Sequence, residues 1–136
     1  MAVEITGRYI GNLAQEMTHG PSGVVLKTVP PVDNQGDGSS LSPTDLVATA
    51  LAACMLTLIT IVGERDGLDL TGLSVHIEKH MSGSPRRIGK LPATIRMPAG
   101  LTPAQRKKLV NAALTCPVNM SLHPDIEREV VFEYPD

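Results

Sequence analysis

The sequence predicts an α+β domain in which antiparallel β-sheet packs around one long central helix. Strand patterns occupy both ends of the 136-residue chain, a long apolar helical pattern lies in its middle, and two shorter helical segments precede the last strand. Strands followed by helices and then strands again are typical of the α+β class. A chain of this length favours a single domain, residues 1–136.

The long helix has recognisable start and stop signals. Ser42 can cap its N-terminus, Pro43 suits the first helical position, and Asp45 takes the place of the acid in a capping box. Gly67 suits the left-handed residue with which helices commonly end. The pattern therefore predicts a helix from about residue 42 to residue 66.

From residue 46 to residue 62 the helix is apolar on nearly all sides, which is normal for a helix that is buried all round. One sheet of short strands covers only one side of it. The other side predicts an association surface, and a two-fold homodimer is the simplest way to cover it. The apolar stretch is at the lower limit for spanning a bilayer and contains three threonines and a cysteine, so a buried core helix is favoured over a membrane span.

The N-terminal region reads as three strands joined by turns. Period-two alternation and turn residues predict an antiparallel meander. Its strands lie at residues 3–9, 13–18 and 24–29. The Gly-, Asp- and Ser-rich stretch 30–41 that follows is predicted to be a mobile or functional loop, because it is long for a connection.

Strand patterns return after Gly67. Alternation predicts one strand over 73–81 and another over 86–97, the latter interrupted near Pro92. A capping box formed by Thr102 and Gln105 then starts a second helix that runs to about residue 114.

The Cys116-Pro117 pair interrupts this second helix, because a residue before proline is pushed out of helical geometry. Pro117 can start a short third helix that ends near residues 123–124. Residues 128–134 are predicted to form the closing strand.

Composition excludes several functions. The net charge is −2 and no basic run is longer than three residues, so nothing indicates nucleic-acid binding. The N-terminal residues do not form a signal peptide, and a cytoplasmic location is expected. Two cysteines in that compartment more often indicate redox chemistry or plain burial than a structural disulfide. Cysteine spacing offers no zinc site, and no cofactor is predicted.

Cys54 and Cys116 are the candidate site residues. In mid-helix, Cys54 can be a small buried hydrophobe. Cys116 is predicted to be the N-cap of the short helix, where free amides favour a thiolate. It can equally be a cap or turn residue with only a structural role. If the two side chains were in contact, an oxidised thiol on one could be closed to a disulfide by the other.

A second polar cluster lies on one strand face, at His76, Glu78 and His80. These three residue types can bind a metal. A solvated polar face is the favoured interpretation, because apolar residues occupy the opposite face of the same predicted strand.

Two segments resemble signature sequences of the OsmC/Ohr family, the osmotically inducible and organic hydroperoxide resistance proteins. The first is Ser42-Pro-Thr-Asp-Leu46 with Ala52-Ala-Cys54-Met55. The second is Thr115-Cys-Pro-Val-Asn119 with Leu122-His-Pro-Asp125. The turn His19-Gly-Pro-Ser-Gly23 and the order of elements extend the resemblance over nearly the whole chain.

The resemblance implies an intertwined homodimer with sheets wrapped around two central helices, and thiol peroxidase chemistry. Cys54 corresponds to the cysteine that reduces an organic hydroperoxide, and Cys116 to the one that resolves it as a disulfide. A dithiol reductant, often lipoyl-linked, restores both thiols. A small-molecule-binding or non-catalytic dimer with inert thiols is the alternative.

The family's reductases activate the first cysteine with an arginine from the N-terminal strands, held by a glutamate at the start of the central helix. Here Thr44 stands where the glutamate is expected. Arg8, His19 and Lys27 are the candidate cations, and the sequence does not decide among them.

Overall fold

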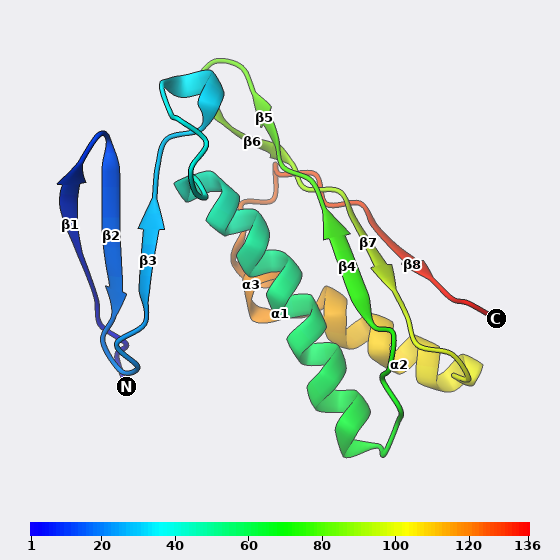
Figure 1. Cartoon of the computed structure of the whole chain (residues 1–136). Helices are drawn as coiled ribbons and strands as arrows, with labels where there is room; N and C mark the ends of the chain where they lie inside the picture. Colours follow the sequence, from blue (N-terminus) through cyan, green and yellow to red (C-terminus); the bar gives the residue numbers. More distant parts are fainter. The chain divides into compact units, whose positions relative to one another are not determined.

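The computed structural model describes all 136 residues (Figure 1). The chain divides into two compact units, Met1–Leu46 and Val47–Asp136. The expected α+β class is confirmed, with small sheets and a long helix. The expectation of a single domain stays a prediction.

The first unit contains a three-stranded antiparallel sheet in the order β1-β2-β3. Its strands are β1 (Ile5–Gly11), β2 (Ala14–His19) and β3 (Val25–Thr28). The predicted meander is therefore correct. A 3₁₀ turn, η1 (Val32–Asn34), lies in the long loop that follows β3.

The turn between β1 and β2 needs left-handed backbone at three successive residues. Gly11, Asn12 and Leu13 have φ values of 94°, 53° and 65°, and a bulge shifts the register beside them. Glycine and asparagine tolerate this region well, which is why the pair was a usable turn signal.

The two faces of this sheet differ in polarity. Ile5 and Tyr9 lie on one face and are 60% and 63% exposed. On the other face Arg8 pairs with Glu16 across the strands, with 2.9 Å between Nε and Oε1. The unit thus presents large apolar side chains to solvent on one face.

The central helix α1 (Pro43–Arg65) has the predicted ends. The Ser42 N–H donates to the Asp45 carboxylate at 2.9 Å, and the Asp45 N–H donates to Ser42 Oγ at 3.0 Å, which is a complete capping box. At the other end Gly67 is left-handed, with φ of 71°. The N–H groups of Gly67 and Leu68 close the last turn on the carbonyls of Glu64 and Gly63, as in a Schellman motif.

The second unit contains a three-stranded sheet in the order β4-β7-β8 and a separate β5-β6 hairpin (Figure 1). The strands are β4 (Ser74–Ile77), β5 (His80–Ser82), β6 (Arg87–Lys90), β7 (Ala93–Arg96) and β8 (Val130–Glu133). β8 runs parallel to β7, so the sheet is not purely antiparallel as expected. The helices are α2 (Pro103–Leu114) and α3 (Pro117–Ser121), which start where predicted.

The single strand predicted over residues 73–81 is wrong. It is broken at residues 78–79 into β4 and β5, which belong to different sheets. The Glu78 N–H donates to the carbonyl of Pro92 at 3.0 Å, but Pro92 has no N–H to return. The β4-β7 ladder therefore ends at this proline, and the chain is interrupted both between β4 and β5 and between β6 and β7. The sequence predicted only the second interruption, near Pro92.

One face of α1 lies in the core of the second unit. Leu51, Met55 and Ile59 are fully buried in one cluster with Ile95 of β7 and Leu109 of α2. Their spacing of three or four residues places them on one side of the helix.

The opposite face of α1 is exposed, as expected for a helix that one sheet covers on one side only. Ala50, Ala53, Thr57 and Ile61 follow the same spacing, and Ile61 is 48% exposed. By length and mean hydropathy (2.3 over its most apolar 18 residues) α1 could cross a membrane, and 33% of that window is buried in the protein. Its buried face identifies it as a core helix.

Candidate redox site

Cys54 lies in the middle of α1 and is half-buried. It packs against the core cluster of the second unit from the flank of the helix. The inner face of α1 fixes this position, because Leu51 and Met55 on either side of Cys54 are fully buried. The thiol is therefore held rigidly at the edge of the core.

Cys116 is the N-cap of α3 and is completely buried. Its backbone is extended, with φ of −62° and ψ of 148°, as proline at the next position requires. Its Sγ accepts a hydrogen bond from the Asn119 N–H, with 3.5 Å between the two atoms. The break between α2 and α3 thus points this thiol inward.

The structure brings the two candidate cysteines together. Cys54 packs against the buried cluster that contains Cys116 and lies close enough to affect the pKa of the Cys116 thiol, and both cysteines are free thiols in this structure. Both belong to the second unit. Spacing along the chain could not establish this contact, because it depends on how α1 and α3 pack.

Burial raises the pKa of the Cys116 thiol above its usual value, and the neighbouring Cys54 side chain raises it further. The N–H groups of Asn119 and Val118 act in the opposite direction but do not outweigh burial. The expectation that the N-cap position favours a Cys116 thiolate is therefore corrected: desolvation outweighs the hydrogen bonds of this five-residue helix.

Asn119 is a site residue that the sequence analysis did not single out. Besides its N–H bond to Cys116, its Nδ2 donates to the Leu114 carbonyl at 2.7 Å and ties the end of α2 to α3. Its Oδ1 is buried without a hydrogen-bond donor. Its position three residues after a cysteine N-cap is the sequence signal that could have identified Asn119 as a partner of Cys116.

The three candidate cations all lie in the first unit. Arg8 is ion-paired with Glu16, His19 Nδ1 lies 2.6 Å from Ser22 Oγ, and Lys27 Nζ donates to Ser39 Oγ at 3.3 Å. These hydrogen bonds and the ion pair are all local to the first unit.

The first turn of α1 contains no glutamate. The Thr44 hydroxyl lies 3.2 Å from Ser42 Oγ, and the Asp45 carboxylate accepts from the Ser42 N–H. Both residues following Pro43 therefore help to cap the helix.

The cluster at residues 76–80 is a hydrogen-bonded surface group. Glu78 accepts from His80 at 2.9 Å, and His76 Nε2 lies 3.3 Å from its other carboxylate oxygen. The hydrogen bond from His80 lowers the pKa of Glu78 most, and the one from His76 lowers it further. No group of three or more His, Cys, Asp or Glu side chains is arranged to hold a metal ion, so the solvated face is the better interpretation.

A family model described as OsmC-like protein matches residues 36–130. The chain belongs to this family. Both cysteine segments lie inside the matched region. No curated protein matches the chain significantly.

Solved structures extend the comparison over the whole chain. A putative osmotic stress induced and detoxification response protein from Psychrobacter arcticus 273-4 is 40% identical, with a TM-score of 0.89 over 95% of this chain and 94% of its own. An organic hydroperoxide resistance protein OsmC from Legionella pneumophila is 21% identical, with a TM-score of 0.70 over 98% and 97%. The organic hydroperoxide resistance protein OhrB of Bacillus subtilis is 19% identical, with a TM-score of 0.63 over 98% of both chains. The last two comparisons establish the fold.

The geometry predicts unequal reactivity of the two thiols. At pH 7, iodoacetamide should alkylate Cys54 well before Cys116, because Cys116 is buried and burial raises the pKa of its thiol. Asn119→Ala should raise the Cys116 rate about fivefold, through the loss of about 1 kcal/mol that holds α3 closed. Peptide mass spectrometry over time measures both rates.

Thr57→Ala is the matched control, because it also removes one 2.7 Å side-chain-to-backbone hydrogen bond, but on α1. It should leave the Cys116 rate unchanged. Equal rates for Cys54 and Cys116 in the wild type would contradict the description of the site.

Proposed function

We propose that this protein is a thiol-dependent peroxidase that reduces organic hydroperoxides through a two-cysteine disulfide cycle. The contact between two free thiols, Cys54 and Cys116, carries this proposal. Membership of the OsmC-like family supports it, as does the fold shared with two proteins named as organic hydroperoxide resistance proteins.

Cys54 is assigned the attacking role because it is the accessible thiol of the pair. Its thiolate would attack the terminal oxygen of the hydroperoxide, and the O–O bond breaks. The alkoxide leaves and takes a proton to become an alcohol, while Cys54 becomes a sulfenic acid. Cys116 is unsuited to this step, since it is fully buried and its pKa is raised.

Cys116 is assigned the resolving role. Its sulfur would attack the sulfur of the Cys54 sulfenic acid, the S–O bond breaks, and the oxygen leaves as water with the thiol proton of Cys116. Burial helps here, because a protected thiol does not react with the peroxide itself. A dithiol reductant such as a lipoyl-linked dithiol would then supply the two electrons that restore both thiols.

The surroundings of Cys54 favour an organic over an inorganic peroxide. Leu51 and Leu58, one turn before and one turn after the thiol, belong to or pack against the apolar core cluster. An apolar wall gains free energy by covering the hydrocarbon part of a substrate, which hydrogen peroxide lacks.

A homodimer is part of the proposal. The outer face of α1, with Ala53 and Ile61, and the apolar face of the β1-β2-β3 sheet, with Ile5 and Tyr9, are exposed in one chain. Apolar surface of this kind marks an association site, and a second copy of the same chain covers it with two-fold symmetry.

The alternative function is a small-molecule-binding or structural protein with inert thiols. The observation that favours it is Thr44 at the position of the family glutamate, with the neighbouring Asp45 occupied in the helix cap. The thiol reactions described next distinguish the two functions.

One equivalent of an organic hydroperoxide such as cumene hydroperoxide should remove two free thiols per wild-type chain. Cys116→Ser should lose its one thiol to a sulfenic acid that a dimedone probe traps, whereas Cys54→Ser should lose none. Free-thiol titration and mass spectrometry measure these changes. An unchanged thiol count in the wild type would exclude the peroxidase and leave the alternative.

The same assay tests which of the three candidate cations activates Cys54. Arg8 is the first of the three candidates to replace, since the resemblance implies an arginine from the N-terminal strands and Arg8 lies in β1. If it serves this role, Arg8→Ala slows thiol loss at pH 7 about tenfold and the deficit shrinks as the pH rises. His19→Ala and Lys27→Ala are its matched controls.

Assembly gives a separate prediction. The wild type should sediment as a dimer at micromolar concentration, and Ala53→Glu should sediment as a monomer, because it places a charge on the outer face of α1. Ala104→Glu, at an exposed position of α2, is the control and should remain dimeric. A wild-type monomer under these conditions would contradict the proposed dimer.

A further inference from the structure

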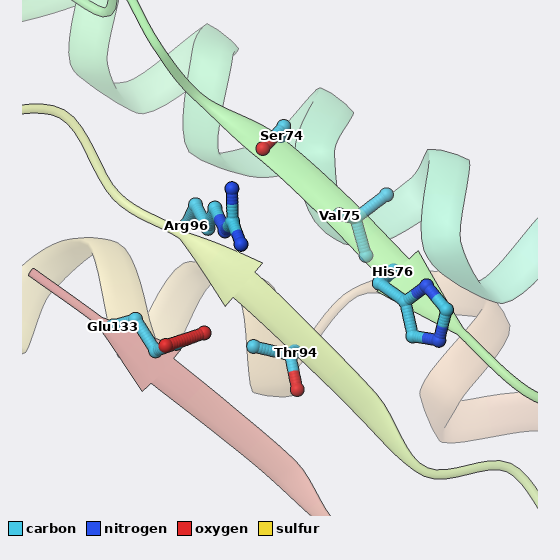
Figure 2. A pocket seen from close by; sticks show the side chains of 6 residues that line it. All are labelled: Ser74, Val75, His76, Thr94, Arg96 and Glu133. Carbon is cyan, nitrogen blue, oxygen red and sulfur yellow. The ribbon is translucent and has the colours of Figure 1, made fainter.

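A polar hollow of about 450 Å³ lies on the solvent-facing side of the β4-β7-β8 sheet (Figure 2). Neither cysteine lines it. Six residues line it: Ser74, Val75, His76, Thr94, Arg96 and Glu133. Figure 2 shows Arg96 and Glu133 on adjacent strands, with the side chains of Ser74, His76 and Thr94 on the same side of the sheet.

Strand register explains why these side chains meet. Ser74 of β4 is opposite Arg96 of β7, which is in turn opposite Glu133 of β8, so the three form one row across the sheet. His76 and Thr94 are opposite each other two residues along and form the next row. Residues directly opposite have Cβ atoms about 4.5–5.5 Å apart and share one face.

Two opposite charges enter the hollow without neutralising each other. Neither the Arg96 guanidinium nor the Glu133 carboxylate makes a hydrogen bond or an ion pair, although their positions are paired across the strands. By contrast Arg8, also cross-strand to a glutamate, pairs with it at 2.9 Å. Arg96 thus keeps a full set of donors, and Glu133 a full set of acceptors, for another molecule.

A second hollow of about 400 Å³ adjoins the first, because Arg96 and Glu133 line both. Its other walls include Met97, Pro98 and Tyr134, so it is more apolar than the first. The Tyr134 ring is held from behind by the Arg106 guanidinium, whose carbon lies 4.1 Å from the ring centroid. Charges at the junction and an apolar wall beyond them would suit a ligand with both features.

We propose that this outer face of the sheet binds a small zwitterion of the amino-acid type that carries an apolar side chain. Its carboxylate binds the Arg96 guanidinium with support from the Ser74 hydroxyl. Its ammonium group binds the Glu133 carboxylate, and its side chain lies against Tyr134 and Pro135. This site is independent of the cysteines and of the peroxidase function.

The chemistry discriminates against singly charged ligands. A simple anion would bind Arg96 but be repelled by Glu133. A simple cation would bind Glu133 but be repelled by Arg96. Only a molecule with both charges satisfies both groups, and each charge-assisted hydrogen bond is about twice as strong as a neutral one.

The test is titration calorimetry with L-leucine as the probe, on the full-length protein and on its Cys54→Ser variant. We expect saturable binding with a Kd of about 1 mM or below, the same for both proteins. L-leucinamide, which lacks the carboxylate, and N-acetyl-L-leucine, which lacks the ammonium group, should each bind about tenfold more weakly or not at all.

Charge-neutralising variants locate the site. Arg96→Gln and Glu133→Gln should each weaken L-leucine binding about tenfold with an unchanged melting temperature, since both side chains are exposed. Lys107→Gln and Glu129→Gln, at exposed positions outside both hollows, are matched controls and should bind like the wild type.

Three results would overturn the proposal. They are the absence of saturable L-leucine binding, binding that Arg96→Gln leaves intact, and wild-type binding of N-acetyl-L-leucine as tight as that of L-leucine. The last result would identify a plain anion site. Because the Cys54→Ser protein is titrated in parallel, failure here does not bear on the peroxidase proposal.

Discussion

The packing of one face of α1 in the core of the second unit is the constraint on which the site depends. Leu51, Met55 and Ile59 are fully buried there, and this fixes the rotation of the helix about its axis. Cys54 is thereby held at the flank of the helix, between the buried face and the exposed one. A rotation by one residue would move this thiol by about 100° and separate it from Cys116.

The break at Pro117 provides the other half of the site. Because proline prevents α2 from continuing, Cys116 becomes an N-cap whose sulfur turns inward and contacts Cys54. The two environments then differ: Cys54 is half-buried, and Cys116 is enclosed with a raised pKa. This difference is the basis on which the proposed cycle assigns the attacking role to Cys54 and the resolving role to Cys116.

Local signals in the sequence predicted much of the fold, and interactions between distant segments account for what was missed. The caps at Ser42 and Thr102 and the break at Pro117 each involve residues three or fewer positions apart, so their patterns are readable. The break at Glu78 depends on a proline in another strand, and the parallel placement of β8 depends on a crossover. Alternation alone contains neither kind of information.

The candidate site divides in the same way. Both cysteines could be named from the sequence, but their contact, the raised pKa of Cys116 and the bonds of Asn119 arise from packing between α1, α2 and α3. The Arg96–Glu133 hollow was missed because its row of residues is assembled from three strands, and no sequence motif joins them.

The central claim is that the two cysteines act on each other within one chain. The most direct measurement is non-reducing denaturing electrophoresis of the hydroperoxide-treated protein, followed by mass spectrometry of its tryptic peptides. The account predicts a band at the mass of one chain, with peptides 28–65 and 109–128 joined by a disulfide that contains Cys54 and Cys116. A band at twice the mass, joined through these cysteines, would contradict it.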